Sequence, residues 1–429
     1  MVKRKQLFLG ILIGLFLCGG SIVTPVFAES TDIENSRLSG TNRYTTSAAI
    51  SEAGWTQSTT VIITNGLGYA DALAASSLSK SEDAPILLTA KNSIDEKIIT
   101  EITRLEATNA ILVGGTGVIG VEVETKLNNL GIATQRIGGT DRYDTSKKVA
   151  EVMGVSNGII MATGYNFPDA LSIAPIAGIK SMPILLSPKD SMNSNITEFI
   201  KSKDIPVSYI VGGTGVISTS VASSLPNNKR LGGDNRYATN LIINQTFKED
   251  LDFSTIYLAT GNDFPDALAG SALAAKNNAP IFLAAKDSLS TETINFLKNK
   301  NVNNIVVFGG SGVVSKDIVN NTIECLTVKS DWKENALKTA KTYSDTMSMS
   351  KAGLYDQLTS EYGEKFTAEE AQYAIDNLNA DWKENALETA KTYSDTMSMS
   401  KAGIYDQLTS EYGEKFTAEE AQYAIDNLK

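Results

Sequence analysis

The sequence predicts an α/β fold class with three homologous small parallel α/β modules, followed by two short all-α repeats. Three observations lead to this prediction. Four short motifs recur three times in the same order, and each recurrence alternates short apolar runs with segments of helical spacing. A second repeat, with a period of 50 residues and a helical pattern, begins at residue 331. A content of 42% hydrophobic and 20% charged residues is typical of a folded chain.

The N-terminal segment 1–28 has the three parts of a secretory signal peptide. Basic residues at positions 3–5 precede an apolar run at 7–17, and small residues precede a cleavage point after Ala28. The apolar run is shorter than the ~20 residues of a spanning helix, so we expect export rather than a membrane anchor. Cys18, at the end of the run, leaves lipidation open as an alternative.

Cleavage changes the charge and the chemistry available to the mature chain. The formal charge is −11, and removal of the three basic residues at positions 3–5 makes it −14. Such a chain is not drawn to DNA or an anionic membrane by its overall field. Cys325 is then the only cysteine, so we expect no internal disulfide. The chain has no histidine, which excludes Ser-His-Asp and Cys-His catalysis but leaves carboxylate-only glycosidase and Ser-Lys chemistry open.

Each module opens with a phrase that holds an arginine and a tyrosine at fixed places: "RLSGTNRYTT", "RIGGTDRYDT" and "RLGGDNRYAT". A guanidinium fork beside an amphipathic ring suits a phosphate or carboxylate on a sugar polymer. Alternatively, each arginine pairs with one of the aspartates Asp71, Asp169 and Asp266 and ties the modules together, and both roles hold if the pairs frame a groove. The pairs are Arg43 with Tyr44, Arg142 with Tyr143, and Arg236 with Tyr237.

The remainder of each module predicts strands and helices in alternation. In the first module the apolar runs "TTVIITNG", "APILLTA" and "NAILVGG" predict strands buried on both faces. The segments "ADALAASSLSKSE" and "SIDEKIITEITRL" have helical spacing, and Ser93 with Glu96 predicts a capping box. The predicted order is strand and helix, three times over. The modules span about 37–130, 136–228 and 230–328.

Two further motifs hold candidate site residues. The aspartate of "ADAL" or "PDAL" begins an apparent helix, where we expect it to complete capping and loop hydrogen bonds rather than to catalyse a reaction. The loops "GGTGVIG", "GGTGVIS" and "GGSGVVS" follow a strand, so their backbone NH groups could cradle an anion. A plain turn with a serine helix cap at Ser218 and Ser315 is the favoured alternative. The candidates are Asp71, Asp169, Asp266, Gly115, Gly213 and Gly310.

The C-terminal repeats span 331–379 and 381–429, and their first 48 residues are nearly identical. They differ at Lys338 against Glu388 and at Leu354 against Ile404. Capping boxes at Asp331–Glu334 and Thr367–Glu370 predict short helices. The expected core of the first repeat comprises Trp332, Leu337, Ala340, Tyr343, Leu354, Leu358, Phe366, Ala371, Ala374 and Ile375.

The triplicated motifs resemble the cell-wall-binding repeat of type 2, which is found on surface proteins of clostridia and their relatives. The resemblance covers about 37–328, and only the first module departs from it, with "GYADAL" in place of "FPDAL". It implies a pseudo-threefold unit that anchors the protein non-covalently to an anionic secondary polymer of a Gram-positive wall, with the arginines, tyrosines, aspartates and glycines above as its polymer-binding residues. The C-terminal pair resembles the repeat of the host cell surface-exposed lipoprotein family, which is associated with prophages and with exclusion of superinfecting phage.

We therefore expect a secreted protein of the cell wall and cell surface that displays a helical protein-interaction module. Its expected partners are the wall polymer and a protein bound by the helical pair. We expect no catalytic residue, cofactor, metal ion, nucleic acid or stable membrane anchor. The alternative is a cell-wall hydrolase, amidase-like or a glycosidase, that the same repeats target to the wall. A third interpretation treats the chain as a surface adaptor.

Overall fold

The computed structural model of the chain describes residues 33–285, 288–327 and 332–429. The predicted signal peptide and Cys18 lie outside the described residues, as does Asp331 of the first C-terminal capping box. Among the helices of the described ranges, none is both long enough and apolar enough to cross a membrane.

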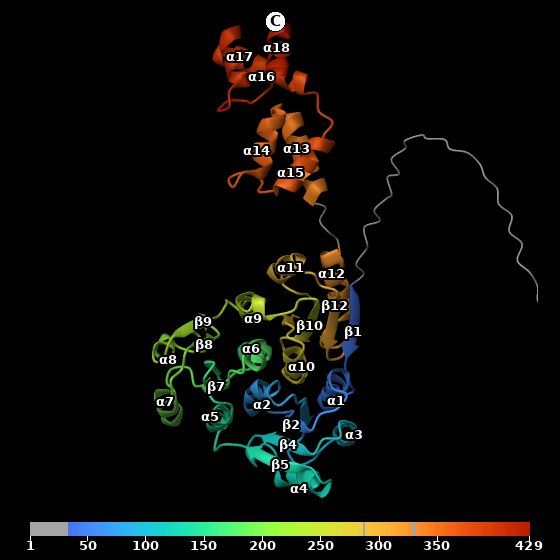
Figure 1. Ribbon diagram of the computed structural model, residues 1–429, viewed down its shortest axis with the longest axis vertical. Helices are drawn as coiled ribbons and strands as arrows, with labels where there is room; N and C mark the ends of the chain where they lie inside the picture. Colours follow the sequence, from blue (N-terminus) through green and yellow to red (C-terminus); the bar gives the residue numbers. More distant parts are fainter. Residues whose placement is uncertain (1–32, 286–287, 328–331) are drawn as a thin grey trace, which may run out of the picture.

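Three four-stranded parallel sheets confirm the predicted α/β modules (Figure 1). Three strands of each sheet lie at the predicted apolar runs, and they are almost wholly buried because helices cover both faces. In strand order, the sheets are β3 (Ile86–Thr89), β2 (Thr60–Asn65), β4 (Asn109–Val113), β5 (Ala133–Ile137); β7 (Ile184–Ser187), β6 (Ile159–Thr163), β8 (Ser208–Val211), β9 (Asn228–Leu231); and β11 (Ile281–Ala284), β10 (Thr255–Thr260), β12 (Asn304–Phe308), β1 (Glu34–Leu38).

The fourth strand of every sheet comes from the opening phrase of another module, which the sequence did not predict. Strands β5 and β9 extend the sheets of modules 1 and 2, and β1 completes the sheet of module 3. Strand β1 pairs with β12 from Glu34 opposite Asn304 to Leu38 opposite Phe308. The sequence repeats and the sheets are therefore offset by one strand, and the three modules close into a ring.

A helix follows each opening phrase, and the sequence did not predict it either. These helices are capped by the residue before the arginine, since the side chains of Asn42, Asp141 and Asn235 accept backbone NH groups of the first turn. The arginine is therefore the first residue of its helix. The helices are α1 (Arg43–Gly54), α5 (Arg142–Met153) and α9 (Arg236–Thr246).

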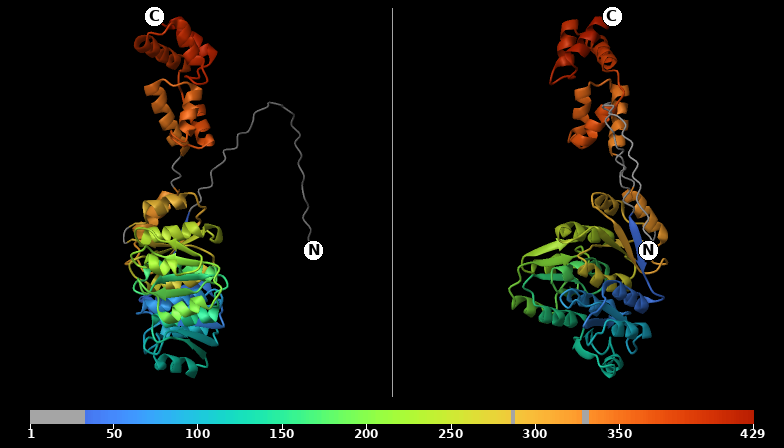
Figure 2. Two further views of the ribbon diagram at one scale, coloured as in Figure 1. Left: turned by 90° about the vertical axis from the view of Figure 1, so that its left-hand side faces the viewer. Right: turned by 45° about the vertical axis from the view of Figure 1, so that its right-hand side comes forward.

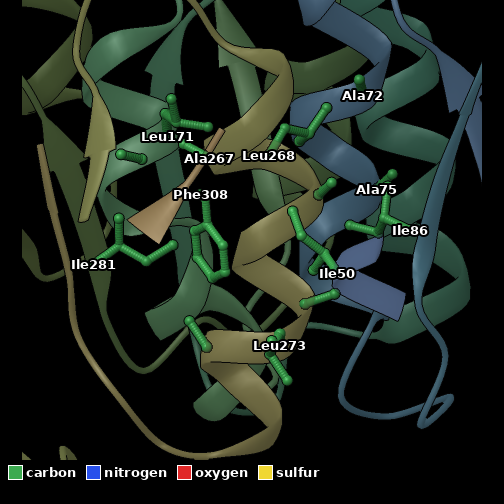
Figure 3. Packing of buried hydrophobic residues seen from close by; sticks show 14 of the residues in the cluster. Ile50, Ala72, Ala75, Ile86, Leu171, Ala267, Leu268, Leu273, Ile281 and Phe308 are labelled. Atoms are coloured by element: carbon green, nitrogen blue, oxygen red, sulfur yellow. The ribbon is translucent and has the colours of Figure 1, made fainter. Parts of the chain in front are cut away.

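Three helices that begin at the aspartate motif meet at the middle of the ring (Figure 1). They are rich in alanine, which lets their backbones approach closely. Figure 3 shows α10 among buried side chains of all three modules, including Ile50, Leu171 and Phe308. The position of Gly270 is needed for this packing, since a Cβ there would collide with the ring of Phe308. The helices are α2 (Tyr69–Ala75), α6 (Pro168–Ile179) and α10 (Pro265–Lys276).

The remaining helices of the ring correct one predicted cap and confirm two others. The expected capping box at Ser93 is wrong, because α3 begins later and Asp95 caps it by accepting the NH of Lys97. The hydroxyls of Ser218 and Ser315 accept the NH groups of Val221 and Ile318, as expected for caps. These helices are α3 (Glu96–Arg104), α4 (Val121–Asn129), α7 (Ser194–Lys201), α8 (Thr219–Ser223), α11 (Thr291–Lys298) and α12 (Lys316–Thr327), with short 3-10 turns η1 (Ser76–Leu78) and η2 (Lys248–Asp250).

The C-terminal region forms two three-helix repeats that stack on each other (Figure 2). The capping box of Thr367 and Glu370 is confirmed. Trp332 was expected in the core of the first repeat, but this is wrong: it is 51% exposed, and Trp382 of the second repeat packs against that core instead. The helices are α13 (Trp332–Met347), α14 (Lys351–Thr359), α15 (Ala368–Asn377), α16 (Trp382–Met397), α17 (Lys401–Thr409) and α18 (Ala418–Asn427).

Candidate functional site

The candidate residues of neighbouring modules meet at three equivalent junctions around the ring. Each junction combines the aspartate of one module with the arginine that begins the next opening helix. Asp71 faces Arg142 at the first junction, Asp169 faces Arg236 at the second, and Asp266 faces Arg43 at the third.

The first two junctions enclose open cavities. The first cavity has a volume of about 410 Å³, and Asp71, Gly115 and Arg142 all line it. The second has a volume of about 280 Å³ and is lined by Asp169, Gly213 and Arg236. The same three motifs, distant in the sequence, therefore supply each cavity.

Each junction arginine is held by its own module and presented to the neighbouring one. Arg43 Nη1 donates to the carbonyl of Gly66 at 2.6 Å, and its guanidinium lies 3.6 Å from the exposed carboxylate of Asp263 in module 3. Arg142 and Arg236 donate in the same way to the carbonyls of Gly164 and Gly261. The carbonyl bond fixes one side of the guanidinium and leaves donors directed toward the junction.

Asp71 is buried, Asp169 and Asp266 are half-buried, and none of the three forms a direct ion pair with these arginines among the described residues. Burial raises the pKa of Asp71, although the hydroxyl of Thr145 and the charge of Arg142 lower it. Burial likewise raises the pKa of Asp169. Burial and the charge of Asp263 raise the pKa of Asp266 to about 6, against the opposing effect of Arg43. The arginine and the junction aspartate therefore influence each other electrostatically, but they do not form a tight ion pair between modules.

The expected capping role of the aspartates is not observed at α6 and α10. The N-cap residues of these helices are Phe167 and Phe264, and neither helix has a side-chain cap bond. The aspartates point instead at the first glycine of the loop in their own module. That glycine has a positive φ, and a Cβ on it would contact the carboxylate of the aspartate. The three glycines are Gly114, Gly212 and Gly309.

The second glycine of each loop leaves open space. A Cβ built on Gly213 or Gly310 would meet no atom within 4 Å, and one on Gly115 would meet only the carbonyl of Gly139, at 3.2 Å. The loop backbone is therefore accessible beside the aspartate, as an anion cradle requires.

The tyrosines of the opening phrases do not join the cavities. The rings of Tyr44, Tyr143 and Tyr237 are half-buried against the hydrophobic core. Each ring closes over the glycine whose carbonyl binds the neighbouring arginine, since a Cβ there would collide with the ring. Burial and, to a smaller extent, hydrogen bonding to Tyr165 raise the pKa of Tyr143 to about 12, so it stays neutral. The rings therefore lie against the glycines that bind the arginines rather than in the cavities.

The sequence did not predict an aromatic triangle that forms at the N-terminal ends of α2, α6 and α10. Tyr69, Phe167 and Phe264 lie with ring centroids 5.8 to 6.1 Å apart. The guanidinium of Arg142 lies 5.7 Å from the centroid of Tyr69, and that of Arg43 lies 5.9 Å from Phe264. The aromatic residue stands two places before the aspartate in all three motifs, which was the available signal. The departure "GYADAL" keeps an aromatic ring at this place.

Two other repeated residues also escaped notice. The first arginine of each phrase binds the glycine loop of the preceding sheet: Arg37, Arg136 and Arg230 donate to the carbonyls of Gly309, Gly114 and Gly212. A threonine stands three places after each junction arginine, and its hydroxyl accepts a hydrogen bond of 3.0 Å from a backbone NH of the same phrase. The donors are Gly40, Gly139 and Gly233, and the acceptors are Thr46, Thr145 and Thr239. Both sets were visible as repeats in the sequence.

The chemistry of a junction suits recognition of a polar, charged sugar. A guanidinium and a bare glycine loop can donate to a phosphate or carboxylate, and a buried aspartate can accept or share a proton with a hydroxyl. Asp71 Oδ1 is buried and has no hydrogen-bond partner among the described residues. No group of three or more Cys, Asp or Glu side chains in the described ranges is placed to hold a metal ion.

Comparisons with known proteins match two family models to separate parts of the chain. The family model described as cell wall binding domain 2 (CWB2) matches residues 37–124, 136–222 and 230–319. The model described as host cell surface-exposed lipoprotein matches residues 331–378 and 381–428.

Several relatives share the ring of modules. N-acetylmuramoyl-L-alanine amidase LytC of Bacillus subtilis is 34% identical over 306 residues, which are 71% of this chain and 61% of the relative. The amidase enhancer of Bacillus subtilis is 31% identical over 291 residues, 66% of this chain and 39% of the relative. The structure of Cwp6 from Clostridium difficile has a TM-score of 0.65 at 29% identity and covers 69% of this chain and 48% of Cwp6. The chain thus spans only part of the length of these proteins.

Proposed function

The chain belongs to the cell wall binding domain 2 family and is thus a cell-wall-binding protein of the cell surface. We propose that its three junctions bind an anionic secondary polymer of a Gram-positive wall. The observation that carries the proposal is the threefold recurrence of one constellation: an oriented arginine, an aspartate that is buried or half-buried, and an open glycine loop. Three weak sites on one rigid ring raise the effective concentration at a repetitive polymer and produce lasting retention.

The polymer must be held by local contacts, because the overall charge of the protein is negative. The formal charge is −11, and loss of the three basic residues in segment 1–28 makes it −14. At the third junction the guanidinium of Arg43 lies near two carboxylates, those of Asp263 and Asp266. We infer a ligand that offers both an anionic group for the guanidinium and hydroxyl groups for the carboxylates, such as a phosphorylated or acidic sugar chain.

The test is co-sedimentation with purified walls, before and after acid stripping of their secondary polymers. The fragment 29–328 should sediment with intact walls as the full mature chain does, and the fragment 331–429 should remain in solution. Stripping the polymer or raising the ionic strength should release the bound fragment. Equal sedimentation of both fragments, or retention that is indifferent to stripping, would contradict the proposal.

We propose further that the C-terminal pair is a protein-interaction module linked to exclusion of superinfecting phage. The support is the match of both repeats to the host cell surface-exposed lipoprotein model. The test compares plaque formation on hosts that display either residues 29–429 or residues 29–328, with phage adsorption as a control. If both chains protected the host equally, the C-terminal repeats would have no role in exclusion of superinfecting phage.

A wall hydrolase is the second candidate, because LytC of Bacillus subtilis is named as an amidase. The absence of histidine in the chain disfavours an amidase of the usual zinc type. Incubation of the mature protein with peptidoglycan distinguishes the two functions: release of soluble fragments would indicate hydrolysis, and co-sedimentation alone indicates binding.

A further inference from the structure

The two helical repeats contact each other through two different surfaces. The second repeat contributes the front face, formed by Trp382, Asn385 and Thr389 on α16, and the first repeat contributes the back face around Ser344, Ser348 and Met349. Asn385 Nδ2 donates to Ser344 Oγ at 3.1 Å and to the Met349 carbonyl at 3.0 Å. Thr389 Oγ1 donates to the Ser348 carbonyl at 3.0 Å.

A second group of contacts extends the same interface. The hydroxyl of Ser350 donates to the carbonyl of Glu414, and the ammonium of Lys415 forms an ion pair with Asp356. The indole of Trp382 packs against the hydrophobic core of the first repeat. The interface therefore combines apolar burial with directional hydrogen bonds, and it is not symmetric.

Each repeat carries both faces, because the two sequences are nearly identical. Residues 332, 335 and 339 repeat the front face of residues 382, 385 and 389, and residues 394, 398 and 399 repeat the back face. The differing residues leave these contacts unchanged. Leu354 and Ile404 are fully buried in the cores of their own repeats, and Lys338 and Glu388 are exposed.

One copy of each face is left uncovered. On the front face, Trp332 is 51% exposed whereas Trp382 is half-buried. On the back face, Ser350 is 1% exposed whereas its counterpart Ser400 is exposed, and Ser344 is 5% exposed whereas Ser394 is half-buried. The chain thus presents an unused front face on its first repeat and an unused back face on its second.

We propose that a second copy of this chain binds head to tail, with the front face of its first repeat on the back face of the second repeat. Every group used in the internal interface has its counterpart in this contact: Trp332 for Trp382, Asn335 for Asn385, and Ser394 for Ser344. Because the two faces differ, each added copy exposes a fresh face, and the association is open-ended rather than limited to pairs.

The contact is expected to be weak in dilute solution and effective at a surface. A repeat of about 50 residues offers a small interface, of the size of transient contacts. Retention of many copies on one wall raises their local concentration toward the millimolar range, where weak contacts are occupied. The proposal does not depend on the nature of the wall ligand, and it is tested in solution without walls.

The test is sedimentation equilibrium of the mature full chain at rising concentration, with two variants that each disable one face. Trp332→Glu removes the exposed indole of the front face, and Ser394→Arg blocks the back face. Neither residue takes part in the internal interface, so circular dichroism should stay unchanged. The matched control is Val152→Glu, which changes a 55% exposed residue on α5 in the ring.

The mean mass of the wild type and of Val152→Glu should rise with concentration, and each disabling variant should associate at least tenfold more weakly. An equimolar mixture of the two variants should regain a single contact, between Trp332 of one chain and Ser394 of the other, and form pairs but nothing larger. A wild type that stays monomeric up to about 1 mM would overturn the proposal. A mixture that remains monomeric while the wild type associates would also overturn it, since some other surface must then be used.

Discussion

Replacing Asp266 by asparagine should stabilise the ring at neutral pH. In the folded chain, burial and the neighbouring Asp263 raise the pKa of Asp266 from 3.8 to about 6, although Arg43 opposes this. The fold therefore disfavours the charged carboxylate that the group adopts at pH 7. Asparagine keeps the shape of the side chain and removes the charge.

The size of the effect follows from the pKa of Asp266. A rise from 3.8 to about 6 corresponds to at most about 3 kcal/mol of folding free energy, at 1.36 kcal/mol per pH unit. Partial exposure of the group and loss of its attraction to Arg43 reduce the expected gain of Asp266→Asn to about 1–2 kcal/mol. The sign depends on pH. Above pH 6 the wild type bears the full penalty; as the pH falls toward 4, its folded state takes up a proton before the unfolded state does, and the penalty disappears.

The assay is scanning calorimetry of the mature chain at pH 7.5 and at pH 4. For a ring of about 300 residues, the variant should melt about 2–4 °C above the wild type at pH 7.5 and together with it at pH 4. Asp263→Asn is the matched control: it removes a charge that raises the pKa of Asp266, so the pH-dependent change in stability should move to lower pH. If Asp266→Asn melted below the wild type at pH 7.5, the junction would stabilise the carboxylate, and this reasoning would be refuted.

Three further predictions concern retention on walls. The triple Arg→Lys change at positions 43, 142 and 236 should reduce the wall-bound fraction far more than any single change, because two intact junctions partly mask one lesion; unchanged binding and melting in the triple variant would remove these arginines from the mechanism. Gly309→Ala should cost about 1–3 kcal/mol in a denaturant titration, since its φ is +96° and a Cβ would meet the junction carboxylate, whereas Gly310→Ala meets no atom and should weaken only wall binding. Wall binding should strengthen between pH 7 and pH 5, as the carboxylate of pKa about 6 loses its charge beside the arginine; a flat binding curve would argue that the polymer does not contact it.

The sequence allowed the sheets and the candidate residues to be predicted because both depend on repetition. The apolar runs coincide with β2, β3 and β4, and the repeated arginine, aspartate and glycine lie together at the first two junctions. What the set does is a matter of geometry that no local pattern contains. Arg142 faces Asp71, 71 positions earlier, rather than Asp169 of its own module.

The errors have physical causes of the same kind. Strand β1 is half exposed and lacks an apolar run, since it lies at a sheet edge, so its pairing with β12 could not be predicted from periodicity. Trp332 and Trp382 have the same local sequence but differ in burial, because only Trp382 follows a folded repeat. Tertiary context, rather than propensity, decided both outcomes.

The pairing of β1 with β12 has a consequence for how the protein folds. Arg37 on β1 donates a hydrogen bond to the carbonyl of Gly309, 272 positions later, so β1 cannot take its place until nearly the whole ring has been made. Contacts of such long range are slow to form. Until then β12 presents an open edge to solvent, the part of a sheet most prone to pair with the wrong chain. The time before β1 pairs with β12 is therefore the period in which the ring is most prone to mispairing, and this pairing ends it because β1 then covers the open edge of β12.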